Sequence, residues 1–268
     1  MIVFVHIPKT AGTSFRFILE NNFGWHHCHT THSRTRRFSA EDLAFARRLF
    51  PGIRSIAGHN LSDPLRIPAP DPFFVTFLRE PVSRVISQYQ EAVVREGETR
   101  TVEEALEQSP LMSNVHVRIM GGGPDLERAK QFLDRCGTVG LTEKFELSLH
   151  VLQRLTPVPL NLAYRRSRIA RDNSVRDSIL SQPRLVEQIR SRNQLDLQLY
   201  DYAVREVFPR FCERAGLSPD AQVPAFASDA NRPGWRFYAG RLFNKCYRQA
   251  SKLRPNPNPA RRGRTSLR

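Results

Sequence analysis

FVHIPKTAGTSF, residues 4–15, decides the fold of this chain because it joins a buried strand to a helix through a short polar turn. Residues 2–7 are mostly apolar, which predicts a strand that is covered on both faces of a parallel sheet. Pro8 ends that run, and a helix is predicted with Thr13 or Ser14 as its cap. A strand followed directly by a helix is the repeating unit of α/β folds.

The same alternation of strand and helix continues along the chain. Strands are predicted at residues 53–57, 73–78 and 138–141, and most are followed by a helical pattern. The strongest is FFVTFL, residues 73–78, after which a helix is predicted to begin near Pro81. Residues 184–208 are amphipathic at helical spacing. The sequence therefore predicts an α/β fold of three layers, with a central parallel sheet between helices.

The domain organisation follows from where this pattern weakens. Residues 1–217 are expected to form the folded domain, and residues 218–246 a weakly ordered C-terminal extension. Residues 247–268 hold seven basic residues, no acidic residue and three prolines, which predicts a disordered basic tail. Without those seven charges, +8 of the net charge of +15 stays on the rest of the chain.

The amino-acid composition limits where in the cell the protein is expected and which partners it is expected to bind. No run of about 18 apolar residues and no signal peptide occurs, so no transmembrane segment is expected. The four cysteines are scattered, which favours a reducing compartment, and we expect a cytoplasmic protein. Peripheral contact of the basic tail with a membrane stays open, and the sequence does not specify an oligomeric state.

The turn after the first strand has the parts of an anion site. A helix that starts at the end of a parallel strand directs free N–H groups and a partial positive charge toward one point. Lys9 adds a full charge, Gly12 allows close approach of the backbone, and Thr13 and Ser14 add hydroxyl groups. The turn is not a Walker A loop, in which the lysine follows the second glycine.

A second group of polar residues follows the strand at residues 73–78. Arg79 comes directly after that strand, and Ser87 lies eight positions later on the predicted helix. The carboxyl ends of parallel strands share one edge of the sheet, so we expect Arg79 near the first turn. Two anion sites without a metal motif suggest a ligand with two separated phosphates.

Five segments together resemble one known enzyme family. HIPKTAGTS (6–14) is similar to the 5′-phosphosulfate loop of sulfotransferases that use 3′-phosphoadenosine 5′-phosphosulfate (PAPS). FLREPVSRVISQY (77–89) resembles the strand and helix that bind the 3′-phosphate there. NVHVRIMGG (114–122), VGLTEKFELSL (139–149) and NQLDLQLYDYA (193–203) also resemble segments of the family. The nearest branch contains heparan sulfate 2-O-sulfotransferase and bacterial relatives.

This resemblance covers roughly residues 1–212 and implies a P-loop NTPase-like sulfotransferase fold that binds PAPS as co-substrate. It assigns the 5′-phosphosulfate to Lys9 and to the loop residues Thr10, Ala11, Gly12, Thr13 and Ser14. It assigns the 3′-phosphate to Arg79 and Ser87, and the catalytic base to His59. The sequence departs from the family pattern at Glu80, where aspartate is usual, and at Asn60, which follows the histidine.

The resemblance implies transfer of a sulfuryl group to a hydroxyl of a carbohydrate or glycolipid acceptor, with His59 and Lys9 as catalytic residues. His29 or His32 is the reserve candidate for the base, and zinc binding by the histidine-rich stretch at residues 26–32 is disfavoured by its spacing. One alternative is a P-loop-like nucleotide kinase or other phosphotransferase, which would need a GK[ST] triplet. The other is a basic nucleic-acid-binding protein without catalytic activity, which would need exposed aromatic residues among the basic ones.

Overall fold

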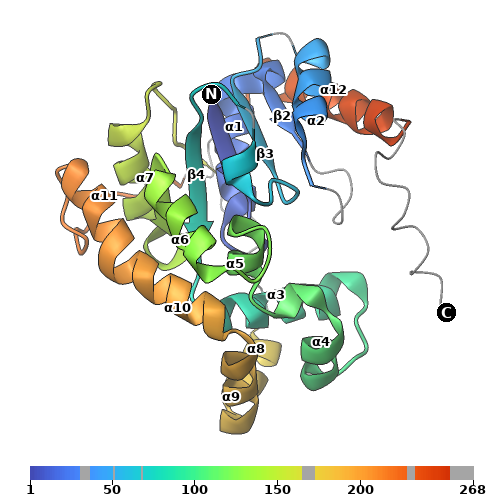
Figure 1. Ribbon diagram of the computed structural model, residues 1–268, viewed down its shortest axis with the longest axis vertical. Helices are drawn as coiled ribbons and strands as arrows, with labels where there is room; N and C mark the ends of the chain where they lie inside the picture. The colour runs from blue at the N-terminus through green and yellow to red at the C-terminus, as the bar shows by residue number, and fades with distance from the viewer. Residues whose placement is uncertain (31–36, 51, 68, 165–172, 228–232, 254–268) are drawn as a thin grey trace.

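The computed structural model describes the 268-residue chain except residues 31–36, 51, 68, 165–172, 228–232 and 254–268. Its centre is a sheet of five parallel strands in the order β2-β3-β1-β4-β5 (Figure 1). The strands are β1 (Ile2–Val5), β2 (His27–His29), β3 (Ser55–Gly58), β4 (Phe73–Leu78) and β5 (Thr138–Leu141). The predicted strands near residues 2–7, 53–57, 73–78 and 138–141 are thus confirmed.

β1 lies in the middle of the sheet. Val3 is level with Ile56 of β3 on one side and with Phe74 of β4 on the other. All four residues of β1 are buried, which explains why the strand is apolar at every position rather than at alternate ones.

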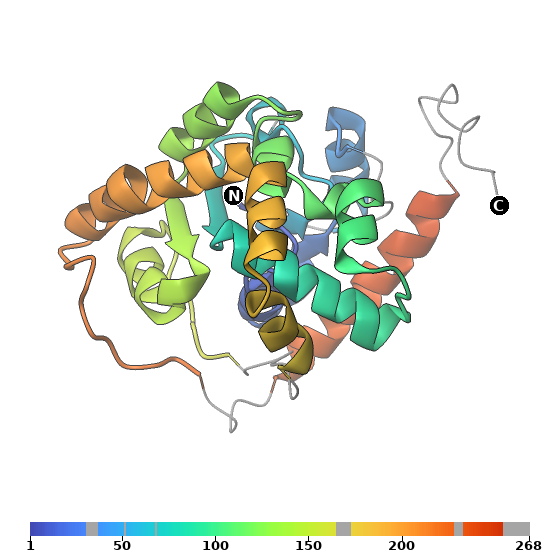
Figure 2. The ribbon, with the colours of Figure 1, turned by 90° about the horizontal axis from the view of Figure 1, so that it is seen from below.

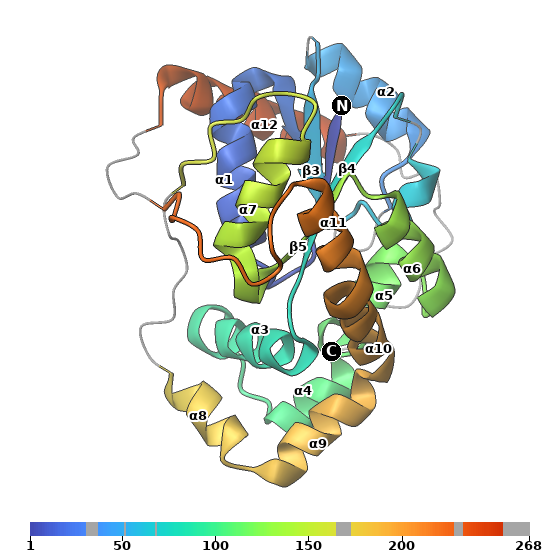
Figure 3. The same ribbon diagram turned by 90° about the vertical axis from the view of Figure 1, so that its left-hand side faces the viewer.

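Helices cover both faces of the sheet, as Figure 3 shows. α1 (Gly12–Phe23) and α7 (Phe145–Leu155) pack on one face, where Phe4 and Phe77 meet Phe15 and Leu149. The other face is covered by α2 (Ala40–Leu49), α5 (Val115–Met120), α6 (Leu126–Arg135), α10 (Gln194–Tyr202) and α11 (Phe208–Arg214). The predicted three-layer α/β architecture is confirmed.

A third apolar cluster lies beyond the carboxyl ends of the strands. It joins α3 (Pro81–Glu96), α4 (Val102–Gln108), α8 (Ser174–Leu180) and α9 (Pro183–Arg192). α3 begins at Pro81, as predicted, and the Glu80 carboxylate accepts hydrogen bonds from the N–H groups of Val82 and Ser83. The cluster therefore forms a floor opposite the edge of the sheet.

The C-terminal region differs from the sequence prediction. α12 (Trp235–Lys252) packs against α1 and the 3₁₀ turn Gly24–His26, and Tyr247 is buried between Phe45 and Phe50. The expected start of a disordered tail at residue 247 thus lies inside a helix, and the prediction is wrong for residues 247–252. Residues 254–268 lie outside the described part, and the division at residue 217 stays a prediction.

Two further local expectations are corrected. The histidine-rich stretch at residues 26–32, where the sequence predicts no strand, contains the edge strand β2, and the cap of α1 is Ala11 rather than Thr13 or Ser14. The amphipathic segment 184–208 is divided at Asn193, where α9 ends and α10 begins.

Among the described residues, none of the helices has the length and apolar character required to cross a membrane.

Candidate active site

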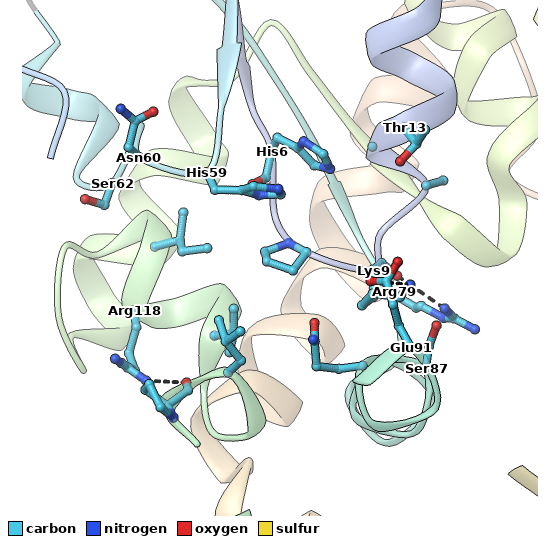
Figure 4. Close-up of a pocket in the computed structure, with 18 of the residues that line it drawn as sticks. His6, Lys9, Thr13, His59, Asn60, Ser62, Arg79, Ser87, Glu91 and Arg118 are labelled. Atoms are coloured by element: carbon cyan, nitrogen blue, oxygen red, sulfur yellow. Dashed lines mark hydrogen bonds and ion pairs between the residues drawn. The ribbon is translucent and has the colours of Figure 1, made fainter. Parts of the chain in front are cut away.

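A cavity of ≈1040 Å³ opens at the carboxyl edge of the sheet (Figure 4). All five strands end at this edge, and the residue directly after four of them lines the cavity: His6, His59, Arg79 and Thr142. The floor is α3, which contributes Ser87, Gln88 and Glu91. The parallel sheet therefore brings together residues that lie far apart in the sequence.

The turn between β1 and α1 has an unusual backbone. Lys9 and Ala11 both adopt left-handed conformations, with φ of 68° and 59°. Such residues cost roughly 1–3 kcal/mol each and cluster at ligand sites. The Thr10 side chain is fully buried and donates to the Ile7 carbonyl at 3.0 Å, which holds the turn between them. The turn thus directs the N-terminus of α1 toward the cavity.

Gly12 is the point of closest packing in this turn. A Cβ built on Gly12 would lie 1.9 Å from the His6 ring, so the position accepts only glycine without a shift of that ring. The His6 ring stacks on Phe4, with centroids 5.2 Å apart, and lies 4.0 Å from the His59 ring. Gly12 therefore lets the helix approach the two histidines.

His59 has a defined tautomer when neutral. Its Nδ1 lies 2.7 Å from the His6 carbonyl oxygen, and since a carbonyl only accepts, Nδ1 carries the proton. The neutral ring then has its lone pair on Nε2. His59 is half-buried at the wall of the cavity, as Figure 4 shows, so Nε2 is suited to accept a proton from a bound molecule.

Arg79 is fixed from two directions. Its Nη1 donates to the Lys9 carbonyl at 3.2 Å, and its backbone N–H donates to His116 Nε2 at 3.4 Å. Burial lowers the pKa of Arg79, and the Glu143 carboxylate opposes that shift. The guanidinium remains charged near neutral pH, because its ordinary pKa is far above that range.

Lys9 contacts a carboxylate at the floor. Its Nζ lies 3.1 Å from Glu91 Oε2, and both side chains are largely shielded from solvent. Glu91 also faces Arg95 at 3.9 Å. Figure 4 shows Lys9, Arg79, Ser87 and Glu91 gathered between the turn and α3. The positive charge of Lys9 is thus balanced by a residue that local sequence pattern did not identify.

The cavity collects nearly all the predicted site residues. Its lining includes Lys9, Ala11, Gly12, Thr13, Ser14, His59, Arg79 and Ser87. The Thr10 side chain does not line it. Sequence reasoning did not single out Gln88, Arg118 or Arg37 as site residues; Arg37 donates to the Gly122 carbonyl at the opposite wall. Gln88 and Arg118 lie within segments that resemble the family, but their approach to the cavity depends on how α3 and α5 pack against the sheet.

His29, one of the two reserve candidates for the base, lies away from the cavity. His29 is buried at the end of β2, between Arg16 and Arg248, whose guanidinium nitrogens lie 3.4 and 3.2 Å from its ring. Burial, and next the charge of Arg16, lower the pKa of His29 well below its ordinary value. His29 does not line the cavity, and His32 lies outside the described residues. Among the described residues, no cluster of three or more His, Cys, Asp or Glu side chains is arranged to hold a metal ion.

A second cavity of ≈610 Å³ adjoins the first. The two share Ala11, Ser14 and Thr142. Phe145 and Tyr164 line the second cavity, with their rings 5.3 Å apart in an edge-to-face arrangement. The N-terminus of α1 therefore lies between a polar cavity and one with aromatic walls.

Comparisons with known proteins give a family and a solved structure to which the chain is similar. Residues 1–133 match the model of a family described as the sulfotransferase family. The chain is similar to a sulfotransferase from Alicyclobacillus acidocaldarius of known crystal structure, at 17% sequence identity. That similarity has a TM-score of 0.43 and covers 74% of this chain and 95% of the other. None of the curated proteins matches the chain.

Proposed function

Over residues 1–133 this chain belongs to the sulfotransferase family, and from that premise we propose that it transfers a sulfuryl group from PAPS to a hydroxyl. The observation that carries the proposal is the meeting of Lys9, His59 and Arg79 at one cavity, each from the end of a different strand. PAPS has two separated anionic groups, and the cavity has cationic side chains from the turn and from the end of β4.

We assign the 5′-phosphosulfate to the turn. In a loose, in-line displacement, negative charge grows on the bridging oxygen of the leaving phosphate. We propose that Lys9 Nζ and the first N–H groups of α1 stabilise that charge. Lys9 must then turn from Glu91 toward the donor. The sulfur–oxygen bond to the phosphate breaks as a bond from sulfur to the acceptor oxygen forms.

We assign the proton of the acceptor hydroxyl to His59. The His6 carbonyl holds the Nδ1 proton, so Nε2 has the lone pair that accepts the proton as the hydroxyl oxygen attacks. The electron pair of the broken bond stays on the phosphate. A neutral imidazole with an ordinary pKa near 6.5 suits this role near neutral pH.

Arg79 and Ser87 are the proposed partners of the 3′-phosphate. Both line the cavity where α3 begins to cross below the turn. The second cavity, between α1 and the Phe145 and Tyr164 rings, is the proposed place of the adenine base. Ser62 and Arg118 line the other side of the first cavity and offer donors to a polyhydroxylated acceptor. This supports a carbohydrate or glycolipid as the acceptor class.

Thermal shift with 3′-phosphoadenosine 5′-phosphate tests donor binding. A ligand at about 100 times its dissociation constant stabilises the folded state by roughly 2.7 kcal/mol. We expect a shift with this bisphosphate and none with ATP-Mg or single-stranded DNA. Lys9→Ala and Arg79→Ala should reduce the shift, whereas Lys130→Ala, a surface control on α6, should retain it.

Transfer of labelled sulfate separates binding from chemistry. His59→Ala should keep the thermal shift with the bisphosphate and lose turnover by about 10²-fold or more. Full turnover in that variant would exclude His59 as the base. A shift with ATP-Mg alone would instead favour a nucleotide kinase, and the sulfuryl-transfer proposal would be abandoned.

A further inference from the structure

α12 has one face that is buried and one that is exposed to solvent. One is buried against α1, α2 and β2 and contains Phe237, Gly240, Asn244, Tyr247 and Ser251. The other points to solvent, yet it is also apolar. Its large residues are Trp235, Tyr238, Leu242 and Leu253, which are 67%, 60%, 61% and 87% exposed, and Phe243 flanks them at 41%. We call these five residues the outer face of α12.

The spacing places these residues on one side of the helix, because positions 235, 238, 242 and 253 each lie close to a whole number of turns from the others. Trp235, Tyr238, Leu242 and Phe243 are close together at the start of α12, whereas Leu253 follows about three turns after Leu242, beyond the exposed Cys246 and Gln249. α12 runs along the edge of the molecule in Figures 1 and 2, beside the edge strand β2. An exposed apolar cluster of this kind on a helix marks an interaction surface rather than a scatter of single residues.

Both tryptophans of the chain lie at this surface. The Trp25 ring is 5.2 Å from the Trp235 ring, and the Arg236 guanidinium lies within 6 Å of both, at 5.9 and 5.8 Å. Tryptophan and tyrosine prefer the boundary between lipid and water, where an apolar ring and a polar group are both satisfied. The pair Trp25 and Trp235 therefore extends the outer face with side chains suited to that boundary.

The sequence of α12 and of the residues that follow it has charges of a single sign. From Pro233 to Arg268 the sequence has ten basic residues and no acidic one. Two of them, Lys245 and Lys252, are exposed on α12 beside the outer face. A helix with aromatic and aliphatic residues on one side and cations next to them has the composition of helices that lie in a membrane interface.

We propose that the outer face of α12 docks this protein on a membrane that contains anionic phospholipids. The aromatic and leucine side chains enter the headgroup region, and Lys245 and Lys252 contact lipid phosphates. The fifteen residues that follow Leu253 contain one large aliphatic residue, Leu267, and so offer little to cover the outer face. A second copy of the chain would bring two sets of like charges together, which disfavours self-association through this face.

Intrinsic fluorescence tests the proposal directly, since both emitting tryptophans lie at the surface in question. We expect a blue shift of emission, and co-sedimentation, with vesicles of phosphatidylcholine and phosphatidylglycerol, and much weaker binding to vesicles of phosphatidylcholine alone. High salt should weaken the binding, because the attraction between exposed charges is screened.

Two pairs of variants locate the contact. Leu242→Ser removes an exposed side chain of the outer face and should reduce vesicle binding about tenfold or more. Val94→Ser, on α3 and 67% exposed, is the matched control and should bind as the wild type does. Lys245→Gln should weaken binding about fivefold, given about 1 kcal/mol for each cation near an anionic surface. Lys130→Gln is its control.

The proposal would be overturned if the outer face of α12 bound something other than a membrane. An absence of the blue shift with anionic vesicles, or equal binding of the Leu242→Ser and Val94→Ser variants, would exclude membrane docking by this face. A concentration-dependent dimer that Leu242→Ser dissociates would assign the face to a second copy instead. The readouts do not use sulfuryl transfer, so failure of the proposed function leaves this test intact.

Discussion

Gly12 shows how one residue determines the closeness of the turn to the histidines. Its Cβ would lie 1.9 Å from the His6 ring, which is held between Phe4 and His59. We expect Gly12→Ala to lower the free energy of unfolding by about 1–3 kcal/mol, because an added methyl group must displace a packed ring. Urea denaturation measures this loss.

The matched control is Gly123→Ala at the far side of the same cavity. A Cβ at Gly123 meets nothing within 4 Å. This variant should be as stable as the wild type or slightly more so, since alanine restricts the unfolded chain. If the two variants had equal free energies of unfolding, the His6 ring would move aside at little cost. The close packing at Gly12 would then not contribute to stability.

Glu91 is the residue whose charge opposes the proposed donor. It lies 3.1 Å from Lys9, in the part of the cavity that we assign to an anion. Glu91→Gln should strengthen binding of 3′-phosphoadenosine 5′-phosphate several-fold, because a like charge is removed and Lys9 is released. Isothermal titration calorimetry measures the change, with Glu96→Gln at the rim as control. Weaker binding would show that Glu91 positions Lys9 for the ligand.

The sequence identified the cationic side of this site and not its acidic side. Lys9, His59 and Arg79 each stand within a few residues of a strand end, and parallel strands bring such positions to one edge. Glu91 lies at the third turn of α3, and its approach to Lys9 depends on how that helix crosses below the sheet. Such a crossing is a property of tertiary packing that no local pattern encodes.

Asp196 links two elements that are far apart in the sequence. This fully buried carboxylate, on α10, accepts hydrogen bonds from the N–H groups of His116 and Val117 at 3.0 and 2.9 Å and from His116 Nδ1 at 2.8 Å. Burial raises its pKa, but the His116 ring and the Arg84 charge outweigh burial, so the pKa is lowered. Asp196 therefore caps α5 while it fixes the histidine that contacts Arg79.

Removal of this carboxylate should be costly. We expect Asp196→Ala to lower the free energy of unfolding by about 3 kcal/mol or more, because it leaves buried donors without an acceptor. Asp201→Ala, in the same helix, should cost less than about 1 kcal/mol, since Asp201 forms an exposed ion pair with Arg205. Similar losses in both variants, measured by urea denaturation, would contradict the role of Asp196.

Helices and strands were predicted where their own sequence has a regular apolar pattern. They were missed where they are buried by neighbouring elements and have no such pattern of their own. β4 was found because five of its six residues are apolar. β2 reads His27, Cys28, His29, which has no apolar run, and it becomes a strand because β3 and α12 cover it. The buried face of α12 includes Gly240, Asn244 and Ser251, so its pattern resembles that of a solvated segment.

The whole molecule should lose stability in acid through its buried histidines. Burial, followed by the charge of Arg16, lowers the pKa of His27 to about 3, and the same two causes lower that of His29. The unfolded chain binds protons on these rings below about pH 6.5, whereas the folded chain does not. The contribution of these two histidines to the free energy of unfolding is therefore constant above that pH. It is lost as the pH falls from about 6.5 toward the pKa values that the two rings have in the folded state.

Urea denaturation near pH 7 and near pH 5 measures this loss. At about pH 5 His27 should contribute roughly 2 kcal/mol to the difference, and His29 should add to it in the same direction. His27→Gln should reduce the difference in the free energy of unfolding between the two pH values by the contribution of His27. This holds whatever the effect of the substitution on stability at neutral pH. His150→Gln, a half-buried histidine on α7, is the control. An unchanged difference in the His27 variant would show that the folded protein accommodates the proton.

The central position of β1 has a consequence for how the chain folds during synthesis. β1 is made before both of its neighbours, β3 and β4, so it lacks its second partner until residue 78 has been made, and the sheet is complete only with β5 at residue 141. Part of the surface of α1 stays uncovered for longer, because α12, which packs on it, ends at Lys252. The nascent chain must therefore carry β1 and α1 without all of their partners while the residues up to 252 are made, a period in which chaperones can bind them.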